Sequence, residues 1–78
     1  MKDASVVNTL VTDIWCEILG VETVQANESF FDLAGTSLAA EQIAARIGDS
    51  LAVTIDGSDI MRSRTLSNVV SFVVSRVA

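Results

Sequence analysis

Apolar residues recur at helical spacing in the first quarter of the chain. Between residues 7 and 18 they fall at intervals of three and four: Val7, Leu10, Val11, Ile14 and Ile18. This period is typical of an amphipathic helix rather than of an alternating strand. Asp3 or Ser5 can cap such a helix, and Gly20 stands where a glycine commonly ends one. The pattern predicts a helix from about Ser5 to Leu19.

Residues 21–36 have no sustained period and form a long connection. A loop of this length in a small domain is usually functional or packed down by its own apolar residues. Phe30 and Phe31 are suited to that packing, together with Val24 and Leu33. We therefore expect both phenylalanines to lie in the core.

Two further helices and a short helical turn follow this connection. The second helix is predicted from about Ser37 to Ile47 and ends at Gly48. Residues 51–55 alternate but have no partner strand, so we expect an extended linker there. A short helical turn is predicted from Ser58 to about Arg62, and a last helix begins at Thr65. Its apolar face comprises Leu66, Val69, Val70, Val73 and Val77.

These elements define the fold class as an all-α bundle. It has three main helices, one short third helix and a long first loop. Half of the 78 residues are hydrophobic and only 19% are charged, which is the composition of a chain that forms a core. We expect a single domain over residues 1–78, because a chain of this size buries a modest core and has too little material for a deep enzyme cleft.

The second helix carries one apolar residue away from its core face. That core face is predicted to comprise Ala39, Ala40, Ile43, Ala44 and Ile47. Leu38 projects on the opposite side, beside Glu41 and Gln42. It is either an ordinary exposed leucine or an apolar knob ringed by polar residues, to which a partner docks. On the second interpretation, Leu38, Glu41 and Gln42 belong to a docking surface.

Charge and residue types exclude several functions. Five basic and ten acidic residues give a net charge of −5, which disfavours nucleic acid and anionic membranes and suits basic partners. There is no histidine, and one cysteine allows neither an internal disulfide nor a cysteine-rich metal site. That cysteine, Cys16, points away from the apolar stripe and is expected as an exposed free thiol. With no signal pattern at the N-terminus, we expect a cytoplasmic monomer without catalytic or metal-binding residues.

Gly35, Thr36 and Ser37 stand at the start of the predicted second helix. Threonine and serine hydroxyls can cap the orphan N–H groups of a first helical turn. A helix N-terminus also favours negative charge, so it stabilises a phosphate ester on a serine at that point. No base is at hand to make Ser37 a nucleophile in its own right, and any chemistry on it therefore needs another protein.

The stretch Glu28–Leu38, with the sequence ESFFDLAGTSL, resembles the modification motif of carrier proteins. More narrowly, it is similar to the peptidyl carrier proteins of nonribosomal peptide synthesis, in which a paired Phe, a Leu-Gly-Gly and a Ser-Leu recur. Trp15–Val21 resembles the end of that family's first helix, and Thr65-Leu66 the start of its last helix. The resemblance covers nearly the whole chain and implies a four-helix carrier fold.

The resemblance also implies a function. Ser37 would accept 4′-phosphopantetheine from coenzyme A through a separate Mg²⁺-dependent phosphopantetheinyl transferase, with Gly35 and Thr36 beside the attachment point. The thiol of this arm would hold an aminoacyl, peptidyl or acyl group as a thioester. Adenylation, condensation or other tailoring enzymes would receive it, and Leu38 would contribute to their docking surface. The carrier supplies the tether, which raises the local concentration of its cargo.

Three positions depart from the family pattern. Ala34 occupies the first glycine of the Gly-Gly pair, which alanine can do where φ is negative. Thr36 replaces the Asp or His that often precedes the modified serine. Glu41 stands where many carriers have an apolar docking residue. The change at Ala34 bears on recognition by the transferase, and the change at Glu41 on the choice of partners.

Two other functions are compatible with the residues. An acyl carrier of a polyketide or fatty-acid pathway fits the acidity, although Phe30, Phe31 and Thr36 argue against it. An unmodified helical adaptor that binds a protein through Leu38 belongs to a different class. Because the chain begins with Met and ends with its last helix, we expect a discrete protein rather than a piece of a multidomain synthetase.

Overall fold

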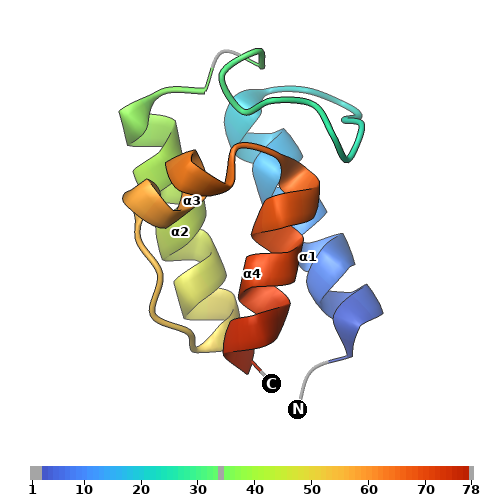
Figure 1. Ribbon diagram of the computed structural model, residues 1–78, viewed down its shortest axis with the longest axis vertical. Helices are drawn as coiled ribbons and strands as arrows, with labels where there is room; N and C mark the ends of the chain where they lie inside the picture. The colour runs from blue at the N-terminus through green and yellow to red at the C-terminus, as the bar shows by residue number, and fades with distance from the viewer. Residues whose placement is uncertain (1–2, 34, 78) are drawn as a thin grey trace.

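Four helices account for most of the computed structural model, which describes residues 3–33 and 35–77. Their bounds are α1 Ala4–Leu19, α2 Ser37–Leu51, α3 Gly57–Ser63 and α4 Leu66–Val77. α1, α2 and α4 run alongside one another, and the short α3 lies beside the first half of α2 (Figure 1). The predicted all-α bundle, with its short third helix and long first loop, is confirmed. None of the helices in the described ranges is long and apolar enough to cross a membrane.

The ends of α1 follow the predicted capping pattern. Asp3 is the N-cap, and its Oδ1 accepts a hydrogen bond from the Ser5 N–H at 2.8 Å. Gly20 ends the helix in the left-handed conformation with φ 71°, and its N–H donates to the Cys16 carbonyl. Few residues other than glycine adopt this φ without strain, so the helix stops at Gly20.

The predicted end of α2 at Ile47 is wrong. The helix continues to Leu51, and Ala52 ends it with a left-handed φ of 56°. Gly48 lies inside the helix, where a Cβ would stand 3.0 Å from the Val53 carbonyl oxygen. The glycine therefore lets the following chain pass close to the helix rather than stopping it. Leu51, predicted in the linker, is a buried core residue.

α3 begins and ends within one residue of the prediction, and α4 begins within one residue of it. Asp56 caps α3 by accepting a hydrogen bond from the Asp59 N–H, and the Asp59 carboxylate accepts one from the Asp56 N–H in return. This reciprocal pair is a capping box. At α4, the Thr65 hydroxyl oxygen accepts from the Asn68 N–H at 3.2 Å. Residues 53–56 form the predicted extended linker without a sheet partner in the described chain.

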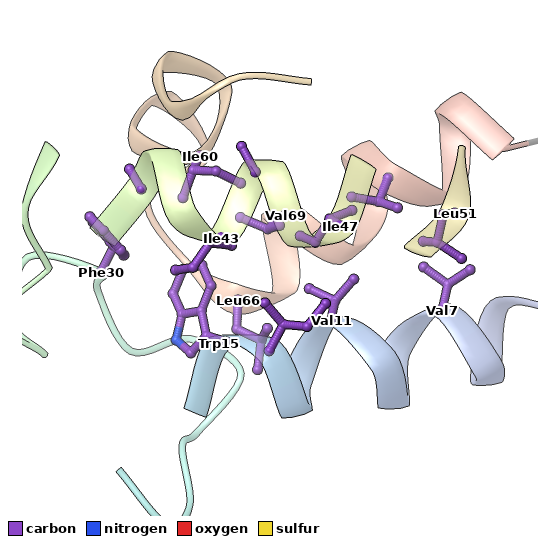
Figure 2. Close-up of a cluster of buried hydrophobic side chains, with 14 residues drawn as sticks. Val7, Val11, Trp15, Phe30, Ile43, Ile47, Leu51, Ile60, Leu66 and Val69 are labelled. Carbon is purple, nitrogen blue, oxygen red and sulfur yellow. The ribbon is translucent and has the colours of Figure 1, made fainter. Parts of the chain in front are cut away.

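One apolar core runs the length of the bundle (Figure 2). Its buried members are Val7, Val11, Ile14, Trp15, Phe30, Ala40, Ile43, Ala44, Ile47, Leu51, Ile60, Leu66, Val69 and Val73. The helical faces predicted from periodicity supply ten of these fourteen residues, and the others are Trp15, Phe30, Leu51 and Ile60. The Trp15 ring meets the Phe30 ring edge to face, with the ring centroids 5.4 Å apart. The Trp15 Nε1 is buried and has no hydrogen-bond partner within residues 3–33 and 35–77.

The long loop is fastened to the start of α4. The Phe30 N–H donates to the Arg64 carbonyl, and the Ser67 N–H donates to the Ala26 carbonyl at 2.9 Å. Phe30 is fully buried, as expected, but the expectation for Phe31 is wrong because 54% of its side chain is exposed. The Phe31 ring contacts the Phe30 ring edge to face, with the ring centroids 5.6 Å apart, and lies on the solvent side of it.

Candidate functional site

Ser37 is the first residue of α2 and is exposed, at the end of the bundle that carries the long loop (Figure 1). Thr36 before it is extended, with φ −118° and ψ 168°, and serves as the N-cap. The Thr36 hydroxyl oxygen accepts from the Ala39 N–H at 3.1 Å, and its carbonyl accepts from the Ala40 N–H at 2.9 Å. Thr36 therefore does the capping, which leaves the Ser37 hydroxyl available for other chemistry.

Gly35 holds the chain before Ser37 against the core. Its N–H donates to the Phe30 carbonyl at 3.0 Å. A Cβ at this position would lie 2.5 Å from two Phe30 ring atoms, far inside van der Waals contact. Close approach to the ring therefore requires glycine here. The expectation for the neighbouring Ala34 concerns a residue outside the described ranges.

Four serines lie in the first turn of a helix, Ser5, Ser37, Ser58 and Ser67, and their surroundings differ. The hydroxyl of Ser5 donates to the Asp3 carboxylate at 3.0 Å, and that of Ser58 donates to the Asp56 carboxylate at 2.6 Å. Ser37 instead follows an uncharged threonine cap. A phosphate ester on Ser5 or Ser58 would face a capping carboxylate, whereas on Ser37 it would meet the positive end of a 15-residue helix. Ser67 also stands beside an uncharged threonine, Thr65, but its N–H already donates to the Ala26 carbonyl. Ser37 is therefore the best of the four for a phosphate.

The capping aspartates are held in their charged form. The Ser58 hydroxyl and the Asp59 N–H lower the pKa of Asp56, and the two hydrogen bonds from Ser5 lower the pKa of Asp3. Both carboxylates are therefore fixed negative charges at neutral pH, which strengthens the contrast with Ser37.

The candidate docking residues divide between two sides of α2. Leu38 is 68% exposed, and Gln42 lies one turn further on the same face. A groove of about 380 Å³ continues this face toward α1; its lining is Ile18, Gln42, Ala45 and Arg46. Glu41 turns instead toward α3, where its Oε1 accepts a hydrogen bond from the Gly57 N–H at 3.0 Å. Leu38 and Gln42 thus share one surface, which Glu41 borders.

Two contacts of this region escape sequence reasoning. Glu41 and Gly57 are 16 residues apart, and Glu17 and Arg46 are 29 apart, so neither pair leaves a periodic signal. The Arg46 guanidinium binds both Glu17 carboxylate oxygens, at 3.1 and 3.2 Å, and lowers the pKa of that carboxyl. This ion pair joins α1 to α2 at the edge of the groove.

Cys16 is half-buried rather than exposed as expected. Its burial raises the pKa of the thiol, and the nearby Asp13 carboxylate adds to this effect. A raised pKa reduces the thiolate fraction and with it the reactivity. In the part of the chain that the structure describes, no three His, Cys, Asp or Glu side chains gather to hold a metal ion.

This geometry defines a class of protein: a small helical bundle with an exposed serine as the first residue of its second helix, as in a carrier domain. The chain matches the family model described as the phosphopantetheine attachment site over residues 9–73. It therefore belongs to that family, as the motif at residues 28–38 predicts. It is a carrier domain that binds 4′-phosphopantetheine covalently.

Its relatives include very large synthetases. Malpinin synthetase of Mortierella alpina is 38% identical over 72 residues, which are 92% of this chain. N-(5-amino-5-carboxypentanoyl)-L-cysteinyl-D-valine synthase of Penicillium chrysogenum is 37% identical over 59 residues, or 73% of this chain. The chain spans only 1% of the first protein and 2% of the second.

A solved carrier has the same fold. BlmI, a type-II acyl carrier protein from Streptomyces verticillus involved in bleomycin biosynthesis, superposes with a TM-score of 0.85. The match covers 92% of this chain and 87% of BlmI at 24% identity. At this identity the likeness establishes the arrangement of the helices.

Proposed function

We propose that this chain is a peptidyl carrier domain of nonribosomal peptide-type biosynthesis and that Ser37 is its attachment residue. The observation that carries the assignment is the setting of Ser37 among the helix-start serines. It is exposed, it does not cap its helix, and it follows an uncharged cap. Ser5 and Ser58 instead donate to capping aspartates, and the N–H of Ser67 is already bound by the Ala26 carbonyl. Gly35 and Thr36 fix the chain just before it.

The chain's own residues prepare Ser37 for modification by a separate phosphopantetheinyl transferase. The Ser37 oxygen would bond to the phosphorus on the pantetheine side of coenzyme A and give up its proton to a base of the transferase, while the pyrophosphate link breaks and the nucleotide leaves with the other phosphate. The resulting phosphodiester is negatively charged and is stabilised by the N-terminus of α2. The thiol at the far end of the group supplies the thioester that holds the cargo.

We propose aminoacyl or peptidyl groups as the cargo. Support comes from the Penicillium relative, whose name describes a synthase of a product built from amino acids. Adenylation and condensation enzymes would be the partners, with Leu38 and Gln42 in their docking surface and Glu41 at its border. These enzymes would perform the catalysis. The carrier would act as a single monomeric domain over residues 1–78 in the cytoplasm.

The assignment of Ser37 is tested by intact mass after incubation with coenzyme A and a promiscuous phosphopantetheinyl transferase. We expect one phosphopantetheine on the native chain, none on Ser37→Ala and one on Ser58→Ala. The Ser58 variant is the matched control, because it removes another exposed hydroxyl from the first turn of a helix. Modification of Ser37→Ala would refute the assignment, and no addition to the native chain would leave a protein-binding adaptor.

The type of cargo needs a loading assay on the modified chain. Transfer of an amino acid from an adenylation enzyme to the arm supports a peptidyl carrier. Loading by acyl-transferring enzymes alone would identify an acyl carrier of a polyketide or fatty-acid pathway instead.

A further inference from the structure

α3 has little of its own to hold it in place. It is 7 residues long, and a helix of this length is not stable alone in water. Ile60 is its buried side chain. At its far end, the Asn68 side-chain amide donates to the Ser63 carbonyl at 2.8 Å. The capping box of Asp56 and Asp59 closes the first turn of α3 but does not join it to another helix.

Glu41 supplies a contact between the first turn of α3 and α2. Its Oε1 accepts the hydrogen bond of the Gly57 N–H at 3.0 Å. Gly57 is buried, and a Cβ there would overlap the Glu41 carboxylate. Gly20 is the glycine with a positive φ among the described residues, so the backbone at Gly57 would accept alanine. A methyl group at this position would therefore displace the Glu41 carboxylate, which is the end of a flexible side chain.

This pair lies next to the proposed attachment site. Glu41 is one helical turn after Ser37 and three residues after Leu38, and its side chain turns toward α3 at the border of the surface that Leu38 and Gln42 share. Among the pairs of helices, α2 and α3 pack against each other most extensively. The first turn of α3 therefore forms one edge of the surface around Leu38.

We propose that Glu41 is a positioning residue. By holding the first turn of α3 against α2, it sets the α2–α3 edge that a partner contacts when it reaches Ser37. The link to a partner rests on the proposed function, whereas the hydrogen bond between Glu41 and Gly57 does not. A charged acceptor makes this bond stronger than one between neutral groups.

The hydrogen bond is tested in the apo protein by NMR. The chain has four glycines, so the Gly57 amide is readily assigned. In Glu41→Ala we expect an upfield shift of its proton and exchange with solvent about five- to tenfold faster. Glu41→Gln keeps an acceptor oxygen and should largely restore both values. Asp49→Ala, which removes one exposed charge from the same helix, is the control and should change neither.

The effect on a partner is tested with the transferase and coenzyme A. We expect Glu41→Ala to raise the KM for the carrier several-fold at unchanged kcat, because Ser37 and its cap are untouched. Glu41→Gln should restore the KM. Gly57→Ala, which displaces the carboxylate, should raise the KM in the native background and leave it unchanged in Glu41→Ala.

The outcomes test separately whether Glu41 positions α3 and whether the position of α3 affects the partner. An unchanged Gly57 amide in Glu41→Ala overturns the positioning role. A displaced amide with an unchanged KM overturns the link between α3 and the partner. If the native chain itself is not modified, the proposed function fails, and the Gly57 amide still decides whether Glu41 positions α3.

Discussion

The two ends of the bundle are packed with different kinds of side chain. At the end where the chain termini lie, aliphatic residues such as Val7 and Leu51 face each other (Figure 2). At the end that carries Ser37, the Trp15 and Phe30 rings meet instead. The aliphatic end joins helices whose backbones are already regular, whereas the aromatic end must anchor a loop with no helix of its own. A few large contacts and backbone hydrogen bonds therefore support the site.

The largest test of this comparison is the pair of adjacent phenylalanines. Phe30→Ala should cost about 3–5 kcal/mol of unfolding free energy, because it removes a fully buried ring from the aromatic end. Phe31→Ala, at an exposed ring, should change it by less than about 0.5 kcal/mol. Urea unfolding followed by circular dichroism measures both. Equal losses of unfolding free energy in the two variants would contradict the anchoring role of the buried Phe30 ring.

Alanine substitutions at two glycines, one near each end of the bundle, test the same difference. Gly35→Ala should cost about 1–3 kcal/mol, because the new methyl would overlap the Phe30 ring. Gly48→Ala meets one carbonyl at 3.0 Å, and a gain in helix propensity of up to about 1 kcal/mol offsets that contact. In thermal unfolding, the melting temperature of Gly35→Ala should be clearly below that of the native protein, and the melting temperature of Gly48→Ala should be close to it. If Gly48→Ala melted lower than Gly35→Ala, the loop would accommodate an added methyl group more easily than α2 does.

Loss of the cap before Ser37 should have a smaller effect. Thr36→Ala removes the hydroxyl that accepts from the Ala39 N–H and should cost about 1 kcal/mol. Thr36→Ser keeps an acceptor and should stay near the native value. The free energy of unfolding in urea distinguishes them. A native-like Thr36→Ala would show that the first turn of α2 is held by other contacts.

The exposed ion pair between Glu17 of α1 and Arg46 of α2 should contribute least to the free energy of unfolding, and it should contribute only above acid pH. Hydrogen bonds from Arg46 lower the pKa of Glu17 below its usual 4.5. A group with a lowered pKa in the folded state stabilises above its unfolded pKa, and this contribution is lost as the pH falls through the folded pKa.

The melting temperatures of the native chain and of Glu17→Gln measure this effect. The native chain should melt slightly higher at neutral pH, and the difference should vanish well below pH 4.5. It should also shrink in high salt, because both side chains are exposed. A difference that persists in acid would contradict an electrostatic origin.

Sequence periodicity and local caps predict most of the fold and the position of Ser37. Asp3 and Gly20 act within a few residues of the helix ends they define, so their roles are readable from the chain. The exposure of Phe31 depends on how the loop turns over the core, and the role of Gly48 depends on the path of the chain after α2. Such features come from tertiary contacts and have no local signature.

Around the site, too, some features have a local sequence signal and others depend on tertiary contacts. The resemblance at residues 28–38 indicates Ser37, and the structure adds why its neighbours suit it. The bond between Glu41 and Gly57 joins two helices, so a single helical wheel assigns Glu41 to solvent. The sequence therefore indicates the proposed attachment residue more readily than the residues that shape its surroundings.

The burial of Trp15 gives the domain an optical reporter of its own. It is the one tryptophan of the chain, and its indole lies in an apolar site against Phe30, at the end that carries the long loop. The fluorescence of a buried indole shifts to longer wavelength when water reaches it. Detachment of the loop can therefore be followed in the unlabelled protein, separately from the loss of helix that circular dichroism records.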